Sequence, residues 1–404
     1  MARTTAHGFK RMSGTLRDFI AIAMAFVGTW VLLRALVPVA LRIGLVDRPN
    51  ELKIHGRATP LIGGLAIFAA FAIAIPLLSV GLTEFRPMLM ACAILVIVGV
   101  LDDFVDLSPA IRFGAQIFAA LIMCLWGDVQ LIDMGLLKFD GSVTTLGLLS
   151  IPLTVFCVVG VVNAVNMVDG LDGLSSGLVL IALAAMGIEV FLSAHQTDGW
   201  VISVLFAAVL AFWFTNTRWS GRDGALSFLG DAGSLFLGFA LAWFVVRLTQ
   251  GDERVFQPVQ ALWFLLIPLS DTVRLLIWRT AMGNSPFQGD QEHLHHVLRR
   301  LRLRHGLTVY LILALALAGA AFGILAPRLG MSELTLFMCF MAWFVVYSLA
   351  LGVAWWRQSL FGISLDRRVA VEQRRVTTER RQGDRRRGGE RRRPVDPRSA
   401  ESED

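Results

Sequence analysis

The chain has 404 residues, of which 55% are hydrophobic and 17% are charged, and its mean hydropathy is +0.64. Soluble domains carry about 25% charged residues, so this composition excludes a row of soluble domains and indicates a membrane protein. The net charge is +6, and residues 356–404 supply +5 of it, with 14 Arg against 9 Asp or Glu.

The apolar stretches predict an all-α, polytopic membrane protein. A helix needs about 20 apolar residues to cross the hydrocarbon core of a bilayer. The first stretch is too long for a signal-peptide core, so we expect a retained membrane helix preceded by a polar segment, 1–17. On this rule we predict about eleven membrane helices, at 18–41, 61–81, 87–101, 109–127, 145–163, 176–194, 200–214, 233–248, 257–277, 307–327 and 332–355.

Polar motifs occupy alternate gaps between these predicted helices. Alternate gaps lie on the same side of a membrane, so the motifs are expected to converge on one site. The first and last of these gaps are rich in Lys and Arg, which places this face, and residues 356–404, in the cytoplasm, with the N-terminus in the periplasm. The motifs are His55–Gly64, Asp102–Asp106, Asn163–Gly173, Gly230–Ser234 and His293–His296.

The C-terminal segment, 356–404, is basic and of low complexity, so we expect it to be disordered. A basic tail beside a membrane domain is typical of a segment that rests on anionic lipid. Nucleic-acid binding is disfavoured because no aromatic residues interleave the charges.

Three carboxylates, Asp102, Asp103 and Asp106, close the third predicted helix. Asp102 and Asp106 are four residues apart, which predicts a shared helix face on which like charges repel. The nearest basic residue in the sequence is Arg112, so we expect the compensating cation to come from elsewhere. Mg²⁺ suits these residues because it takes oxygen ligands and often completes its shell with phosphates. The alternative is a solvated acidic helix end.

Asn163, Asn166, Asp169 and Asp172 follow one another in steps of three. A glycine directly follows each aspartate, which disfavours an unbroken helix through this segment. A helix end that bends into a loop brings all four side chains toward one pocket, where we expect them to contact substrate or metal.

The Gly230–Ser234 motif immediately precedes the eighth predicted helix. Small residues at a helix N-terminus expose backbone N–H groups that suit a phosphate, and Asp231 beside them is a candidate Mg²⁺ ligand.

His293, His295 and His296 lie in an Arg-rich segment. Their spacing lacks the i,i+4 pair of helical zinc motifs, and the four cysteines lie in apolar stretches without a CxxC pair, so zinc and disulfides are disfavoured. We expect the histidines to donate hydrogen bonds to phosphates or a base, with Arg279 as a cation for a diphosphate.

Together these motifs resemble those of the bacterial polyprenyl-phosphate N-acetylhexosamine-1-phosphate transferases. The resemblance runs from about Arg42 to Trp355 and rests on DDxxD, NxxNMVDGxDGL, GDAGS and SPFxxDxxHxHH. It is strongest for the branch that transfers N-acetylglucosamine-1-phosphate to undecaprenyl phosphate, because Leu294 interrupts the three consecutive histidines of the muramyl-pentapeptide branch.

The resemblance implies a role for each motif residue. Asp231 and Asn166 match metal-binding residues for Mg²⁺, with Mn²⁺ as the alternative ion. Asp102 and Asp103, with Asp106 in the same motif, match the residues assigned to the lipid phosphate and catalysis. Residues matched to the nucleotide-sugar site are Asp169, Asp172, Phe228 (stacking on uracil), Arg279, His293, His295 and His296; Asn163 belongs to the same motif.

The implied reaction is transfer of N-acetylglucosamine-1-phosphate from UDP-GlcNAc to undecaprenyl phosphate with release of UMP, at the bacterial inner membrane. It would start the synthesis of O-antigen or a related surface glycan. The same reaction with another UDP-N-acetyl amino sugar stays open, and a homodimer is a family-level expectation. Two other classes are disfavoured: a transporter with polar residues on broken helices, and a zinc hydrolase.

Overall fold

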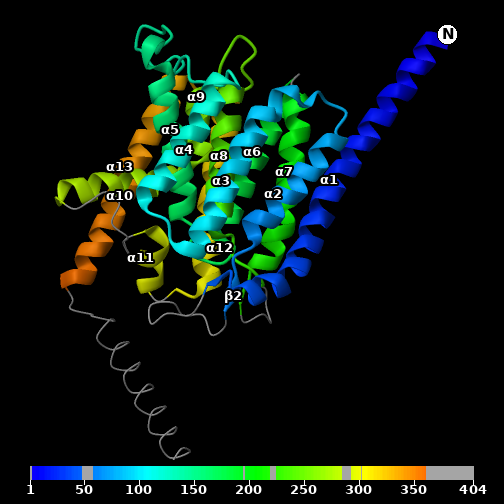
Figure 1. The fold of residues 1–404 in the computed structure, drawn as a ribbon. Helices are drawn as coiled ribbons and strands as arrows, with labels where there is room; N and C mark the ends of the chain where they lie inside the picture. The colour runs from blue at the N-terminus through cyan, green and yellow to red at the C-terminus, as the bar shows by residue number, and fades with distance from the viewer. Residues whose placement is uncertain are drawn as a thin grey trace, which may run out of the picture. The chain divides into compact units, whose positions relative to one another are not determined.

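The computed structural model describes residues 2–47, 58–193, 196–218, 224–283, 293–301 and 303–360, and most of these are helical (Figure 1). The only paired strands within them are β1 (Val46–Asp47) and β2 (Thr59–Pro60), which are antiparallel. The all-α prediction is therefore confirmed. The α-helices are α1 (Ala2–Ile43), α2 (Gly63–Ala74), α3 (Arg86–Val105), α4 (Pro109–Leu125), α5 (Ser150–Met167), α6 (Leu174–Leu192), α7 (Gln196–Asn216), α8 (Gly230–Thr249), α9 (Pro258–Phe264), α10 (Leu266–Ala281), α11 (Leu294–Arg300), α12 (His305–Arg328) and α13 (Glu333–Leu360).

Eight helices in the described part of the chain are long and apolar enough to cross a membrane, and α9 with α10 would make a ninth. Two further apolar helices are shorter: α4, and α2 extended by the 3₁₀ turn Ile75–Leu77. The protein is thus polytopic, while the total of eleven spans stays a prediction. Helix α1 already begins at Ala2, and the predicted tail lies outside the described residues from 361 onward.

The predicted span 257–277 is wrong as an unbroken helix. It divides into α9 and α10, whose axes differ by 88°, and Figure 1 shows α10 lying across the direction of its neighbours. Pro268 supplies the reason. It stands four residues after Phe264, the last residue of α9, and proline has no N–H to donate to that carbonyl. One α-helical hydrogen bond is therefore missing at this junction, which allows the chain to bend there.

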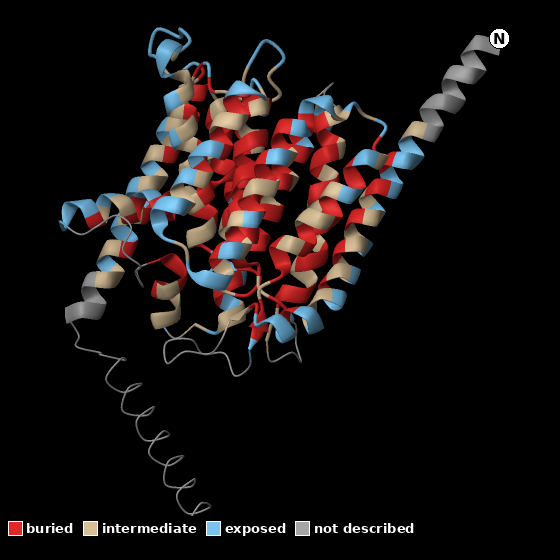
Figure 2. Ribbon diagram, in the orientation of Figure 1, coloured by how far each residue is buried: buried red, intermediate tan, exposed pale blue. Residues whose placement is uncertain are grey.

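Helix α8 lies in the middle of the bundle and is buried along almost its whole length (Figure 2). Small residues allow its first turn to approach α2 and α3 closely. A Cβ on Gly64 would lie 2.1 Å from the backbone nitrogen of Gly233, and one on Gly99 would lie 2.3 Å from the Cα of Ala232. This packing fixes the N-terminus of α8, and with it Asp231, among the neighbouring helices.

The two ends of the bundle carry different parts of the chain. Helices α3 and α5 end, and α8 and α12 begin, at the end that also carries β2 and α11 (Figure 1). We call this the motif end. The opposite end, here the far end, carries the connection from α4 to α5 and the connection from α8 to α9. All contacts described below lie within Met1–Leu351, the larger of two units into which the chain divides.

Candidate functional site

A cavity of about 370 Å³ opens at the motif end. Four of the sequence motifs contribute to its lining: Leu61 from the His55–Gly64 motif, and residues from the C-terminal part of α3, the turn after α5 and the start of α8. The predicted site residues among the lining are Asp103, Asn166, Asp169, Asp172, Phe228 and Asp231, joined by Asp47 and Asn216.

The Gly230–Ser234 motif forms the first turn of α8 instead of preceding it. Gly230 has a positive φ of 72°, and a Cβ there would lie 2.6 Å from Asp103 Oδ2, so glycine is required on both counts. The backbone N–H of Asp231 donates to Asp103 Oδ1 over 3.0 Å. One N–H group expected for a phosphate is therefore bound by Asp103.

Asn166 connects α5 to the start of α8. Its Nδ2 donates to Asp231 Oδ1 over 2.6 Å and contacts Ser234 Oγ at 2.8 Å. Both bonds use Nδ2, so Oδ1 is the atom that Asn166 can offer to a cation. Asn163, one helical turn earlier, donates to Gln116 Oε1 over 2.6 Å and is not among the cavity-lining residues.

The expectation for Asp102 and Asp106 was wrong on two points. Helix α3 ends at Val105, and Asp106 is an exposed C-cap with a φ of 52°, so the two carboxylates do not share a helix face. Asp102 also has a local cation, since Arg112 Nη1 lies 3.0 Å from its Oδ2. Its Oδ1 accepts the N–H of Leu107 over 2.7 Å. Asp102 is thus engaged within the protein and does not line the cavity.

The turn after α5 carries Asp169 and Asp172, as the glycine pattern predicted. Gly173 has a φ of 80° and ends the turn, and Asn216 Oδ1 accepts its N–H over 2.6 Å. Asp172 is buried and forms an ion pair with Arg218. Asp169 lines the cavity with an exposed side chain. The negative charges of Asp231 and Asp172 raise the pKa of its carboxyl above the usual value.

The histidine motif lies at the start of α11. His293 Nδ1 is 2.8 Å from Asp271 Oδ2, and the His293 and His295 rings stack 5.6 Å apart. His295 packs on the turn after α5, because a Cβ on Gly170 would lie 2.3 Å from His295 Nε2. Burial lowers the pKa of His295 to about 3 and that of His296 to about 4. Both are neutral at pH 7 and can donate hydrogen bonds without carrying charge.

Phe228 and Arg279 differ in their placement. Phe228 lines the cavity, and its backbone is held between Pro60 and Gly63 by two hydrogen bonds of 2.9 Å each. Arg279 is buried in the last turn of α10 and is not among the cavity-lining residues. The motif parts 48–57 and 284–292, which include His55 and Ser285, lie outside the described residues.

Residues 85–249 match glycosyl transferase family 4. The undecaprenyl-phosphate alpha-N-acetylglucosaminyl 1-phosphate transferase of Haemophilus influenzae is 34% identical over 342 residues, which cover 83% of this chain and 94% of the relative. The chain belongs to glycosyl transferase family 4. Proteins of the same name from Yersinia pestis and Escherichia coli K12 are 34% identical over 318 residues (78% of this chain, 87% of the relative) and 32% identical over 339 residues (84% and 91%). The resemblance is thereby confirmed, and the family 4 chain is a phosphoglycosyltransferase.

A divalent cation fits the donors at the start of α8. Within the described ranges, no group of three or more His, Cys, Asp or Glu side chains is arranged to hold a metal ion. Mg²⁺, however, is usually bound through one or two carboxylates and keeps waters or substrate phosphates as its other ligands. Asp103 Oδ2 is buried and has no hydrogen-bond partner among the described residues. This orphaned oxygen, beside Asp231 and Asn166, matches such a partial ligand set.

Four residues that shape the family 4 site were not predicted as site residues from the sequence. Arg112, Asn216 and Arg218 hold Asp102, the turn after α5, and Asp172 in place. Asp271 contacts the histidine motif. Only Asp271 carried a clear signal in the sequence, because a carboxylate inside an apolar stretch is costly and usually has a specific partner.

Proposed function

We propose that this family 4 enzyme transfers N-acetylglucosamine-1-phosphate from UDP-GlcNAc to undecaprenyl phosphate and releases UMP. The observation that carries the proposal is the cavity at the start of α8, where Asp103, Asn166 and Asp231 meet, in a chain that matches relatives named for this reaction over most of its length. The reaction would be the first membrane step of O-antigen, lipopolysaccharide or related surface-glycan synthesis.

In the proposed reaction, an oxygen of the lipid phosphate attacks the β-phosphorus of UDP-GlcNAc. A new P–O bond forms, and the bond from the β-phosphorus to the bridging oxygen breaks as UMP leaves. The C1–O bond of the sugar is untouched, so its anomeric configuration is kept. A phosphate monoester has its second pKa near 6, so at neutral pH the acceptor is mostly dianionic and needs no strong base.

The cavity residues divide between donor and acceptor. Phe228 would stack on uracil, since every base offers a π-face to an aromatic ring. Asp103 is better placed than Asp102 to meet the acceptor or a cation, because one Asp103 oxygen is without a partner among the described residues while both Asp102 oxygens are engaged. Asp102 then acts through Arg112, which also lies 3.9 Å from Asp231.

Mg²⁺, with Mn²⁺ as the alternative, would be held by Asp231 and Asn166 with Asp103 nearby. When bound, the ion would neutralise the diphosphate and the charge that develops on UMP. Asn166 orients Asp231 for this role by donating to one of its oxygens. The neutral histidines of α11 would add hydrogen bonds to the donor phosphates.

The motif end would face the cytoplasm of the bacterial inner membrane. Arg42 lies in the last turn of α1 there, and Arg299 and Arg300 lie in the last turn of α11. This agrees with an excess of basic residues on the cytoplasmic side. UDP-sugars are cytoplasmic metabolites, so the cavity would open to the compartment that supplies the donor.

The decisive test is transfer of radiolabel from UDP-GlcNAc to undecaprenyl phosphate by purified protein in detergent, with and without Mg²⁺. We expect Mg²⁺-dependent lipid product and one UMP per transfer. Release of UDP would mean glycosyl transfer and would overturn the mechanism. Full activity after chelation of all divalent ions would remove the metal from the proposal.

A panel of other UDP-N-acetyl amino sugars separates the main proposal from its alternative. Product from another donor, with none from UDP-GlcNAc, would keep the reaction and change only its substrate. Reporting kcat/KM for each donor under one salt and detergent condition makes the comparison quantitative.

A further inference from the structure

Asp271 is a buried carboxylate in the second turn of α10, flanked by Ser270 and Thr272. Its Oδ2 lies 2.8 Å from His293 Nδ1. Its Oδ1 accepts the N–H of Leu294 over 3.1 Å and the O–H of Tyr347 over 2.9 Å. Arg274, on the next turn of α10, approaches Oδ1 to 3.7 Å. One side chain thus joins α10, α11 and α13.

These contacts fix the tautomer of His293. Besides His293, two donors, the Leu294 N–H and the Tyr347 O–H, and one arginine surround Asp271. This is the environment of an ionised carboxylate, which can only accept hydrogen bonds. The proton of a neutral His293 must therefore be on Nδ1. Its Nε2 is left as the nitrogen that can act on another group.

Asp271 also holds the start of α11. The first N–H groups of a helix have no partner within the helix. A carboxylate at the N-terminus accepts one of them and interacts favourably with the helix dipole. Leu294 is the first residue of α11, and its N–H is bound by Asp271. One residue further, His295 packs on Gly170 in the turn that carries Asp169. A chain of contacts therefore runs from Tyr347 through Asp271 to the cavity.

We propose that Asp271 is a positioning residue for phosphosugar transfer. It docks the histidine motif against the turn after α5 and presents His293 in the Nδ1-protonated form. Tyr347 supports it from α13. The kinetic part of this inference rests on the proposed function, whereas the docking part does not.

A double-mutant cycle tests whether Asp271 acts through His293. Asp271→Asn can donate to Nδ1 and so favours the opposite tautomer; we expect kcat to fall about 10- to 100-fold, as for other carboxylates that orient a functional histidine. Combined with His293→Gln, it should cost no more than His293→Gln alone. Wild-type kcat in Asp271→Asn, or losses that multiply in the double variant, would overturn the proposal.

The neighbouring α13–α10 contact supplies a matched control. Trp343 Nε1 donates to Ser270 Oγ over 3.2 Å, one residue before Asp271 and one turn before Tyr347. Tyr347→Phe removes only the hydrogen bond to Asp271 and should lower kcat about 2- to 10-fold. Trp343→Phe should stay within about 2-fold of wild type. Equal losses in both would assign the effect to general α13 packing and sink the proposal.

Hydrogen exchange tests docking without any activity. Asp271→Ala should raise amide exchange in 293–301 by about 10-fold or more, and Trp343→Phe should not. Unchanged exchange would overturn the docking role. If the wild type transfers no sugar phosphate, the proposed function fails, while exchange still decides the docking. If Asp271→Ala cannot be purified, Tyr347→Phe must show the same change to a smaller degree.

Discussion

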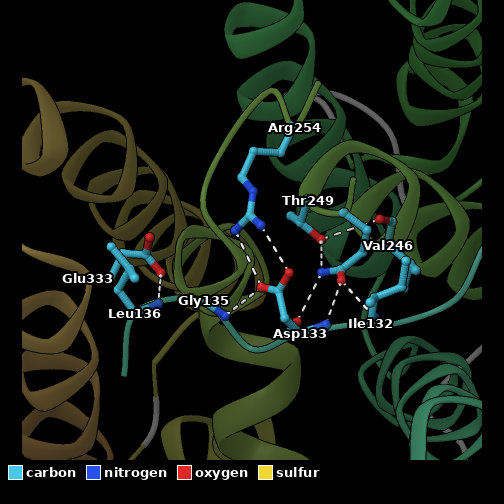
Figure 3. A network of polar contacts seen from close by, with 9 residues as sticks. Ile132, Asp133, Gly135, Leu136, Val246, Thr249, Arg254 and Glu333 are labelled. Atoms are coloured by element: carbon cyan, nitrogen blue, oxygen red, sulfur yellow. Dashed lines mark hydrogen bonds and ion pairs between the residues drawn. The ribbon is translucent and has the colours of Figure 1, made fainter. Parts of the chain in front are cut away.

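The carboxylates at the far end of the bundle and three carboxylates of the cavity at the motif end, Asp103, Asp169 and Asp231, lie in opposite electrostatic settings. At the far end, carboxylates meet arginines directly. Figure 3 shows one such network, in which the Arg254 side chain points toward Asp133. The two lie 2.9 Å apart, and Asp133 also accepts the N–H of Gly135, while Gln250 accepts the N–H of Ile132. Glu189 and Asp198 are paired in the same way, with Arg328 at 2.7 Å and Arg247 at 2.6 Å.

At the motif end, Asp103, Asp169 and Asp231 surround one cavity, and Arg112 approaches Asp231 only to 3.9 Å. Crowded carboxylates repel, and they lower the stability of the fold unless a cation is added. The paired far-end carboxylates therefore serve the fold, as do Asp102 and Asp172 at the motif end through Arg112 and Arg218. The carboxylates of Asp103, Asp169 and Asp231 are instead kept for the reaction at a cost to stability.

Asp231→Asn should separate activity from stability most sharply. Losing this carboxylate removes a metal ligand and a charge beside the transferring phosphate, so we expect kcat to fall about 1,000-fold or more. The same change relieves repulsion from Asp103, so the melting temperature in detergent with chelator should be unchanged or higher. Radiolabel transfer and thermal unfolding of the same preparation provide the two measurements.

A lower melting temperature together with lost activity would contradict this separation. It would mean that Asp231 serves the fold as the far-end carboxylates do.

Asp133→Asn is the reciprocal experiment at the far end. It weakens the ion pair with Arg254 but keeps an oxygen for the N–H of Gly135. Hydrogen bonds to charged groups contribute about 1.5–3 kcal/mol, so the free energy of unfolding should fall by that order. Transfer activity at 20 °C should stay within about 3-fold of wild type, since additive effects are expected between distant sites. Loss of activity without loss of stability would break the comparison.

Much of the fold could be predicted from the hydrophobic stretches, because a backbone that spans a bilayer must form helices or a closed barrel. Polar motifs occur in every second segment between the predicted membrane helices. This pattern correctly predicted that the motifs of α3, α5 and α8 lie at one end of the bundle. The break between α9 and α10 was missed, although Pro268 was visible. Proline within a membrane helix can be accommodated by neighbouring groups, so its effect depends on packing that sequence spacing does not reveal.

The candidate site was readable where one motif supplies both the side chain and its geometry. The glycines beside Asp169 and Asp172 predicted the turn that the structure contains. Partners from distant segments were not readable. Arg218 and Asn216 reach Asp172 and Gly173 across more than 40 residues of sequence, at separations of 46 and 43. Such pairings depend on helix packing, which leaves no periodic signal.

The buried histidines predict an acid-sensitive motif end. The pKa of His295 is about 3 in the folded protein and near 6.5 when unfolded. Between these pH values the unfolded state binds a proton that the folded state does not. The free energy of unfolding is therefore highest above pH 6.5, as far as His295 is concerned, and falls as the pH is lowered. The loss is about 1.4 kcal/mol per pH unit for one group. His295→Gln should reduce the dependence of unfolding on pH between 6.5 and 5.5; an identical pH dependence would argue against a neutral buried His295.

The smallest expected change in stability concerns the two ion pairs of Arg247 at the far end. Arg247 contacts both Asp198, whose side chain is 7% exposed, and Glu84, whose side chain is 64% exposed. Exposed pairs contribute about 0–1 kcal/mol because water screens them, so Glu84→Gln should change the free energy of unfolding by about 0.5 kcal/mol or less. Asp198→Asn should lower the free energy of unfolding several times more, because it leaves a half-buried guanidinium without its buried partner.

Urea unfolding of the two variants at 0.1 and 0.5 M salt measures both effects. Added salt should reduce the stability difference between wild type and Glu84→Gln, but not the difference between wild type and Asp198→Asn. Equal costs would show that burial does not set the strength of the far-end pairs.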